Sequence, residues 1–202
     1  MKIISILFIS LVISGSAFSQ IVDKPYNVGL GLGIVHPNLV LNKGSSDTVS
    51  IKNSTGFIVV LNGEYFINKS ISLSPKIGLA FNRGTVIFEK SNGYKENYDL
   101  MSVSYDFMLD LTINKSNNAL KPYILFGGKY KIPMTGKMNT SKYPPENSSF
   151  AIDVGIGLNK SITKLIVNPE IRYSYGISNI NSHPKINSLY FHSISFIVYF
   201  KA

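Results

Sequence analysis

Charged side chains that recur within alternating apolar segments are the residues of this chain best suited to chemistry. Eight of them share the strand parity of the small residues around them, so we expect them to face one enclosed interior. They are Glu64, Lys76, Asp106, Asp110, Lys129, Asp153, Glu170 and Arg172. Asp106 and Asp110 have the residue types of a general acid and base. Four residues along one strand separate them by roughly 13 Å, which is too far for both to act on one bond.

These eight charges need partners if the fold encloses them. Five are acidic and three are basic, and a lone buried charge is strongly unfavourable, whereas a hydrogen-bonded pair can break even. Arg172 is the expected hub because its planar guanidinium can bind two carboxylates at once. We predict a structural, salt-bridged cluster in the interior. A proton or ion pathway is the functional alternative.

Other chemical motifs in the chain are incomplete. His36 and His183 fall in expected outer loops, where they could meet on a metal ion, although loop histidines are more often simply solvated. The glycine run 29–33 has the wrong spacing for a dinucleotide-binding loop. The chain also has no local Ser-His-Asp signature and no cysteine. We therefore expect no enzymatic activity, no cofactor and no metal site.

The composition indicates a surface that water does not fully cover. Of the 202 residues, 45% are hydrophobic and 15% are charged, whereas about 25% of the residues of a soluble domain are charged. The formal charge is +9, from 20 Lys+Arg and 11 Asp+Glu. It is spread over turns and loops rather than gathered in one patch, which argues against nucleic acid as a partner.

The first residues have the pattern of a cleavable signal peptide. Lys2 precedes an apolar run over residues 3–13, and the small residues that follow favour cleavage before Gln20. A membrane anchor is the alternative, but a spanning helix needs ~20 apolar residues. We predict that residues 1–19 are the signal peptide and that residues 20–202 are an exported domain.

The exported part alternates between apolar and small or polar residues with a period of two, which indicates β-strands. In the clearest run, the odd-numbered residues from Met101 to Ile113 are apolar or aromatic. No segment has a 3.6-residue period, so the domain is predicted to be all-β. The eight runs begin with the one that starts at Tyr26 and continue with Thr55–Ile67, Ile71–Lys90, Tyr94–Ile113, Lys121–Ile132, Phe150–Asn159, Ile162–Gly176 and Leu189–Phe200.

The connections between these runs alternate in length. Short links cover residues 68–70, 114–120 and 159–161, and longer ones cover residues 36–54, 133–149 and 177–188. This asymmetry is typical of a transmembrane barrel with short periplasmic turns and longer extracellular loops. We predict an eight-stranded antiparallel transmembrane β-barrel with both termini on the short-turn side. A short extra strand near Thr48–Ile51, outside the membrane, is left open.

Residue size indicates which face of the strands meets lipid. The polar face is mostly Gly, Ser, Asn and Ala, and small residues fit the crowded interior of an eight-stranded barrel. The apolar face then turns outward, with aromatic residues forming girdles at the two membrane interfaces. The candidates for these girdles are Tyr26, Tyr65, Tyr98, Tyr130, Phe150, Tyr173, Tyr175, Tyr190 and Phe200. The alternative is a secreted or periplasmic soluble β-barrel with inverted faces that binds an apolar ligand.

Four blocks of the chain resemble a known family. Val103–Leu111 and Lys121–Gly128 are similar to the central hairpin of the Bacteroidota outer-membrane β-barrel domain family, which includes PorT-like proteins. Asp153–Leu158 and Pro169–Ile180 are similar to that family's glycine-rich strand and to its Glu-x-Arg-Tyr strand with the following loop. The resemblance implies an outer-membrane location and, through PorT-like relatives, assistance to protein secretion.

One feature departs from this resemblance, because outer-membrane barrels commonly end on an aromatic residue and here Lys201 and Ala202 follow Phe200. We expect a small integral outer-membrane barrel with a structural, adhesive or secretion-accessory role. An open pore is disfavoured because side chains fill an eight-stranded barrel. The expected partners are outer-membrane lipids and lipopolysaccharide, the barrel-assembly machinery during insertion, and secretion or envelope proteins.

Overall fold

The computed structural model describes residues 26–43, 48–89, 94–114, 120–134, 147–162, 165–181 and 186–202. The predicted signal peptide, residues 1–19, lies outside these ranges. No helix in the described residues has the length and apolar character needed to cross a membrane. The described strands are β1 (Tyr26–Lys43), β2 (Thr48–Phe66), β3 (Ile71–Glu89), β4 (Lys95–Leu100), β5 (Val103–Asn114), β6 (Leu120–Pro133), β7 (Ser149–Ile162), β8 (Leu165–Gly176) and β9 (Ile186–Lys201).

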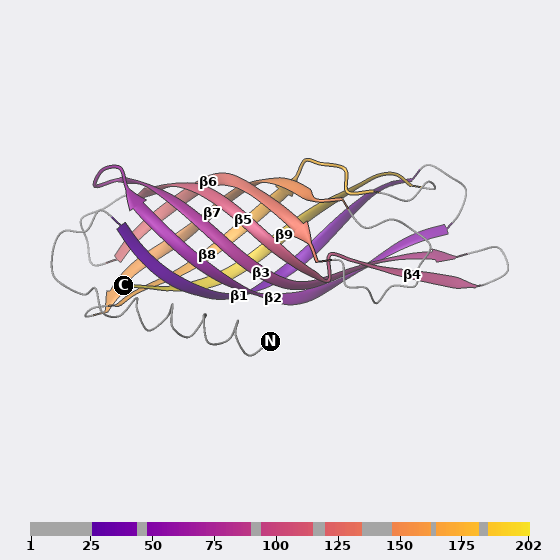
Figure 1. Ribbon diagram of the computed structural model, residues 1–202, viewed down its shortest axis with the longest axis horizontal. Coiled ribbons are helices and arrows are strands. Elements are labelled where there is room, and N and C mark those ends of the chain that lie inside the picture. The colour runs from indigo at the N-terminus through magenta and orange to yellow at the C-terminus, as the bar shows by residue number, and fades with distance from the viewer. Residues whose placement is uncertain are drawn as a thin grey trace.

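Eight of these strands close into an antiparallel barrel (Figure 1). The sheet order is β2-β1-β9-β8-β7-β6-β5-β3-β4, and an additional pairing of β2 with β3 closes the ring. Every pair of neighbouring strands is antiparallel. The end of the chain is fixed to its first strand, because the Ala202 amide donates to the Val28 carbonyl at 3.0 Å. The predicted eight-stranded antiparallel barrel is confirmed.

The predicted single strand Tyr94–Ile113 is wrong, because the chain breaks it at Met101 and Ser102 into β4 and β5. Met101 has a φ of 50°, in the left-handed region that residues other than glycine rarely adopt. β3 pairs with both pieces: it pairs with β5 in the wall of the barrel and with β4 beyond the end of the barrel. β4 and β5 keep one register against β3, with Gly84 opposite Leu100 and Phe81 opposite Val103, so the sequence pattern gives no sign of the local break at Met101.

The wall of the barrel is inverted relative to a soluble protein. Large apolar side chains point outward and are exposed, including Leu32 at 51%, Ile156 at 60% and Phe126 at 61%. Charged side chains point inward, and Arg172 has no exposed surface. A soluble barrel would bury its large apolar residues, so the structure does not favour the soluble alternative. An outward apolar band is how a barrel meets lipid.

Aromatic side chains are exposed near both edges of this band. Tyr98 and Tyr190, which the sequence suggested for the girdles, belong instead to strand segments beyond the barrel. The remaining candidates are between 38% and 54% exposed on the outer surface: Tyr26, Tyr65 and Phe200 near the short-turn end of the barrel, and Tyr130, Phe150, Tyr173 and Tyr175 toward the other end.

Strands continue beyond the barrel at the end opposite the C-terminus (Figure 1), and we name this part the extension. It forms two ribbons, one of β1 with β9 and one of β2, β3 and β4. The predicted loop over residues 36–54 is therefore largely strand, because β1 runs to Lys43 and β2 begins at Thr48. The extension consists of residues 36–43, 48–54, 83–89, 95–100 and 186–192.

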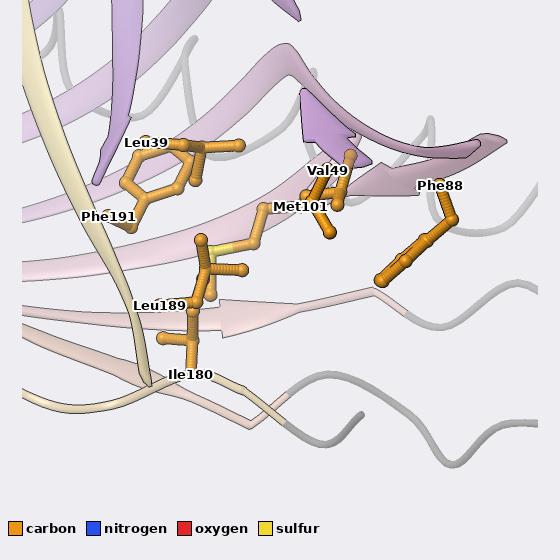
Figure 2. Packing of buried hydrophobic residues seen from close by; sticks show 8 residues of the cluster. Leu39, Val49, Phe88, Met101, Ile180, Leu189 and Phe191 are labelled. Atoms are coloured by element: carbon orange, nitrogen blue, oxygen red, sulfur yellow. The ribbon is translucent and has the colours of Figure 1, made fainter. Parts of the chain in front are cut away.

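The two ribbons of the extension share an apolar core (Figure 2). Both ribbons supply side chains to it, and Ile180, which follows β8, covers one side. The extension is thus built like a small soluble protein, with its apolar residues inside. The buried members of this core are Leu39, Val49, Val86, Phe88, Met101, Ile180, Leu189 and Phe191.

Candidate functional site: the charged interior of the barrel

All eight charged residues singled out from the sequence lie in the interior of the barrel. Each occupies an inward strand position, and none is more than 5% exposed. Six of them form one central cluster around Arg172, which lies on β8. Asp106 and Glu64 lie outside that cluster and have partners of their own.

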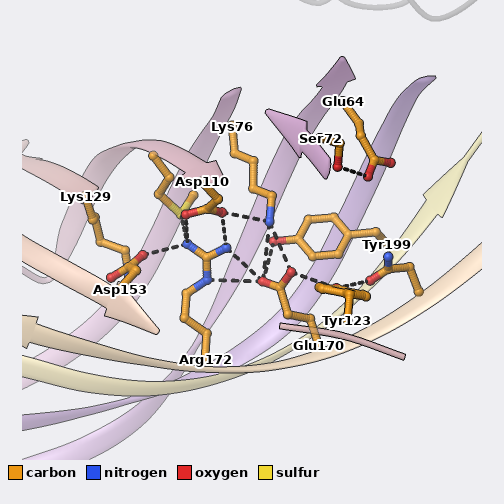
Figure 3. Close-up of polar contacts among 12 residues, drawn as sticks. Glu64, Ser72, Lys76, Asp110, Tyr123, Lys129, Asp153, Glu170, Arg172 and Tyr199 are labelled. Atoms are coloured by element: carbon orange, nitrogen blue, oxygen red, sulfur yellow. Dashed lines mark hydrogen bonds and ion pairs between the residues drawn. The ribbon is translucent and has the colours of Figure 1, made fainter. Parts of the chain in front are cut away.

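Arg172 binds three carboxylates from three strands (Figure 3). Its Nη2 lies 2.5 Å from Asp110 Oδ2 and 2.8 Å from Glu170 Oε1, and its Nη1 lies 2.6 Å from Asp153 Oδ2. Its Nε donates a further bond to Glu170 Oε1 at 3.1 Å. A planar guanidinium can make these contacts at once because its donors point in several fixed directions.

Two lysines complete the central cluster. Lys76 Nζ lies 3.0 Å from Asp110 Oδ2 and 3.1 Å from Glu170 Oε2. Lys129 Nζ lies 3.7 Å from Asp153 Oδ2 and donates to Ser174 Oγ at 2.5 Å. Three acids and three bases therefore balance within the cluster, which removes the penalty of an unpaired buried charge.

Two further ion pairs include lysines that the sequence reasoning missed. Lys131 Nζ lies 2.8 Å from Asp106 Oδ1, and Lys201 Nζ lies 2.9 Å from Glu64 Oε2. The expected ratio of five acids to three bases is therefore wrong, since the described interior holds five of each. Two features of the sequence could have identified such lysines. Lys131 has the same strand parity as Lys129, and the predicted interior held more acids than bases.

Two tyrosines extend the network around Glu170. The Tyr123 hydroxyl lies 2.8 Å from Glu170 Oε2 and 2.5 Å from Asn168 Oδ1. Asn168 donates in turn to Asn159, which leads the polar chain toward the short-turn end of the barrel. On the other side, Lys76 Nζ lies 4.6 Å from the centre of the Tyr199 ring, a distance at which the ring face attracts the cation.

Glycines make room for this network at two points. A Cβ on Gly127 would collide with the Asp110 carboxylate and with the backbone behind it, and a Cβ on Gly157 would collide with the Tyr123 ring. Both glycines lie on strands next to the side chain that they accommodate. Small residues on the inner face therefore serve the packing of large polar side chains.

A group of apolar residues occupies another part of the interior. They come from β2, β3, β5 and β9, whereas the charged cluster comes mainly from β5, β6, β7 and β8. The Tyr199 ring lies between the two parts, because it packs in the apolar group and also faces Lys76. The buried residues of this group are Ile58, Val60, Ala80, Met108, Ile197 and Tyr199.

The chemistry available to the interior is charge pairing. Each of its five carboxylates already contacts a lysine or arginine, so none is presented as a free acid or base. Within the described ranges no three His, Cys, Asp or Glu residues gather as a metal site would require. His36 is exposed, with Nδ1 at 2.9 Å from Thr55 Oγ1, and His183 lies outside the described residues.

The chain is similar to several solved outer-membrane proteins. OprG from Pseudomonas aeruginosa is 13% identical with a TM-score of 0.61, over 87% of this chain and 93% of OprG. Neisserial surface protein A is 14% identical with a TM-score of 0.56, over 89% and 97% of the two chains. The outer membrane enzyme PagL is 13% identical over 87% of this chain and 97% of PagL, with a TM-score of 0.39. No curated protein matches the chain.

A family model agrees with the likeness to these structures. The model described as the outer membrane protein beta-barrel domain matches residues 5–201, nearly the whole chain. The closed barrel, its apolar outer band and its polar interior are the features that such a domain requires. The chain belongs to the outer membrane protein beta-barrel domain family and is a small outer-membrane β-barrel.

Proposed function

We propose that the protein is a closed barrel that anchors an ordered β-structure at the cell surface, where it has a structural or adhesive role. One observation carries the proposal: a charge-balanced network and an apolar group together fill the barrel interior. An eight-stranded barrel is only wide enough to be filled by side chains, so this protein holds its place in the membrane without conducting or catalysing. The extension is then the part that is free to meet other molecules.

The orientation follows from the asymmetry of the two ends. In outer-membrane barrels short turns face the periplasm and the longer connections face outward. The short-turn end of this barrel holds both the start of β1 and the end of β9. We assign that end to the periplasm and the extension to the outside of the cell.

Bilayer conductance tests the closed state. The purified protein is reconstituted in planar lipid bilayers beside an open porin, and we expect no ion current above the leak of the bare membrane. A steady single-channel conductance would refute the closed barrel. Electrophoretic mobility before and after heating checks that the sample is folded, because folded membrane barrels resist SDS until heated.

The export prediction has its own test. We propose that residues 1–19 are removed and that the mature chain starts at Gln20. Intact-mass measurement of protein from the outer membrane gives the new terminus. A protein that retains residues 1–19 would support the anchor alternative instead.

A secretion-accessory role is the second candidate, and the resemblance to PorT-like members of the Bacteroidota family supports it. The two roles differ in what a deletion does. A secretion accessory predicts that exported proteins accumulate in the periplasm when the chain is absent, whereas a structural or adhesive protein leaves secretion intact. Comparison of secreted proteins from the deletion strain and the complemented strain distinguishes the two roles.

Lipid headgroups and the assembly machinery are the proposed general partners. Lys69, Lys121 and Lys160 are exposed near the short-turn end of the barrel, where they can approach phospholipid phosphates. Lys52 and Lys95 are exposed on the extension, within reach of lipopolysaccharide phosphates. For assembly, β9 keeps an alternating apolar outer face that ends at Phe200, while Lys201 turns inward to Glu64.

A further inference from the structure

The outer wall of the barrel has a pit on β5, β6 and β7. Its volume is about 350 Å³, and its walls are formed mainly by Phe107, Leu109, Tyr130 and Phe150 around Gly128. These residues are outward neighbours in the sheet: Gly128 pairs with Leu109, and Tyr130 pairs with both Phe107 and Phe150. The pit is therefore set into the lipid-facing surface and not into the charged interior.

The pit exists because Gly128, at an outward position of β6, has no side chain to fill it. A Cβ built on Gly128 would meet a single atom within 4 Å, Phe150 Cζ at 4.0 Å, so the space in front of the glycine is open. The surrounding outward residues are all large, with Leu109 at 53% and Phe107 at 43% exposure. The Tyr130 and Phe150 rings, whose centres lie 6.2 Å apart, form the wall on the side nearer the extension.

We propose that this pit binds one acyl chain of lipopolysaccharide in the outer leaflet. The pit is continuous with the apolar band, the surface through which a barrel meets the acyl chains of lipids. An acyl chain in the pit would contact the aromatic rings of its walls on several sides, whereas the rest of the band offers one flat contact. Gly128 lies two residues from Tyr130 and five from the end of β6 at Pro133. The pit is thus in the half of the wall nearer the extension, which is the outer leaflet in the orientation proposed above.

Gly63 provides a matched control for this site. It also lies on the outer face, since it pairs with the lipid-facing Val28, and a Cβ there would make only an ordinary contact with Pro75 at 3.4 Å. Gly128→Leu fills the pit with a side chain, whereas Gly63→Leu adds the same side chain to another part of the wall. Both variants add the same apolar surface, so an effect of general hydrophobicity would appear in both.

Native mass spectrometry measures the bound lipid. The wild type and both variants are extracted from outer membranes in mild detergent, and the fraction carrying one lipopolysaccharide molecule is followed as detergent is increased. We expect one retained lipopolysaccharide on the wild type and on Gly63→Leu, and at least a tenfold lower retained fraction on Gly128→Leu. Each sample must keep the heat-dependent mobility of a folded barrel.

Three outcomes would overturn the proposal. They are no retained lipid on the wild type, equal retention on Gly128→Leu, and retention of a phospholipid in place of lipopolysaccharide. If Gly128→Leu only raises the stability of the barrel without changing retention, the pit is a packing defect. A conducting barrel would refute the proposed closed state but would leave the lipid count unchanged, so the two failures are distinguishable.

Discussion

The barrel and the extension share strands but have opposite polarity, and β1 shows the difference along one strand. Its even-numbered residues face outward throughout: Leu32 is exposed to lipid in the barrel, and Asn38 is exposed in the extension. Its odd-numbered residues face inward, with Gly31 in the barrel and Leu39 in the apolar core of the extension. The same residues of the two-residue repeat face outward along the whole strand. The outward face is apolar in the barrel and polar in the extension, and the inward face is the reverse.

We infer that this exchange marks the edge of the membrane. Outward residues must suit the surrounding solvent, which is hydrocarbon around the barrel and water around the extension. On β1 the exchange occurs between Ile34, which is 56% exposed and apolar, and the exposed His36. Two kinds of core follow: paired charges beside an apolar group inside the barrel, and packed apolar side chains inside the extension. Substitutions should therefore act differently in the two regions.

The largest effect is expected from Arg172→Leu. The substitution leaves the carboxylates of Asp110, Asp153 and Glu170 with only two lysines between them, and removal of one partner from a buried ion pair costs about 3–5 kcal/mol. Denaturant unfolding in lipid vesicles measures the loss. Arg172→Lys keeps the charge without the planar fork, so its loss should be smaller. A loss below about 1 kcal/mol for Arg172→Leu would contradict the role of Arg172 as the hub.

Leu189→Ala should act on the extension and leave the barrel intact. Leu189 is 2% exposed in the apolar core, and truncation of a buried leucine costs about 2–5 kcal/mol. Hydrogen exchange followed by mass spectrometry should show faster exchange over residues 36–43 and 186–192, with unchanged rates over β7 and β8. Val40→Ala is the control, since Val40 is 43% exposed. Faster exchange throughout the barrel would show that the two regions unfold as one unit.

The same substitution on the two parts of β1 tests the membrane edge. Leu32→Lys places a charge on the lipid face and should cost more than about 1 kcal/mol, approaching the ~2–4 kcal/mol of a lysine at the bilayer midplane. Asn38→Lys lies on the same outward face in the extension, where the side chain meets water, and should change stability by less than about 0.5 kcal/mol. Unfolding of both variants in vesicles gives the comparison. Equal losses would place both positions in the same solvent and would move the membrane edge.

Parity along the sequence was sufficient to predict the barrel and the inward position of most of its charges. Alternation fixes which residues share a face regardless of the solvent, so Lys76, Asp110 and Arg172 could be assigned to one side. The partners that were missed lie near strand ends, where Lys131 precedes the end of β6 and Lys201 closes β9. Charge balance would have found them, because five buried acids with three bases leave two carboxylates unpaired.

Only part of the extension was missed, since residues 83–89, 95–100 and 189–192 fell within predicted strands. Residues 36–54 were predicted as a loop because the polar and apolar faces of the strands exchange there, although the strand that the sequence suggested near Thr48–Ile51 is the start of β2. The break between β4 and β5 depends on the positive φ of Met101, which its residue type does not indicate. The sequence predicts that Arg172 binds interior carboxylates, but it does not say which ones. The partners, such as Asp110, are determined by which strands the closed barrel brings together.

The smallest effect is expected where the extension has an ion pair of its own. Lys95 Nζ lies 3.5 Å from Glu89 Oε1 across β3 and β4, with side chains 60% and 44% exposed. Water and salt screen such a pair, so Lys95→Ala should cost only about 0.2–1 kcal/mol, measured by denaturant unfolding at low and high salt. Lys131→Met is the matched test in the barrel, where the pair with Asp106 is buried and its loss should resist salt. If both substitutions cost the same and respond equally to salt, the two regions do not differ in their access to water.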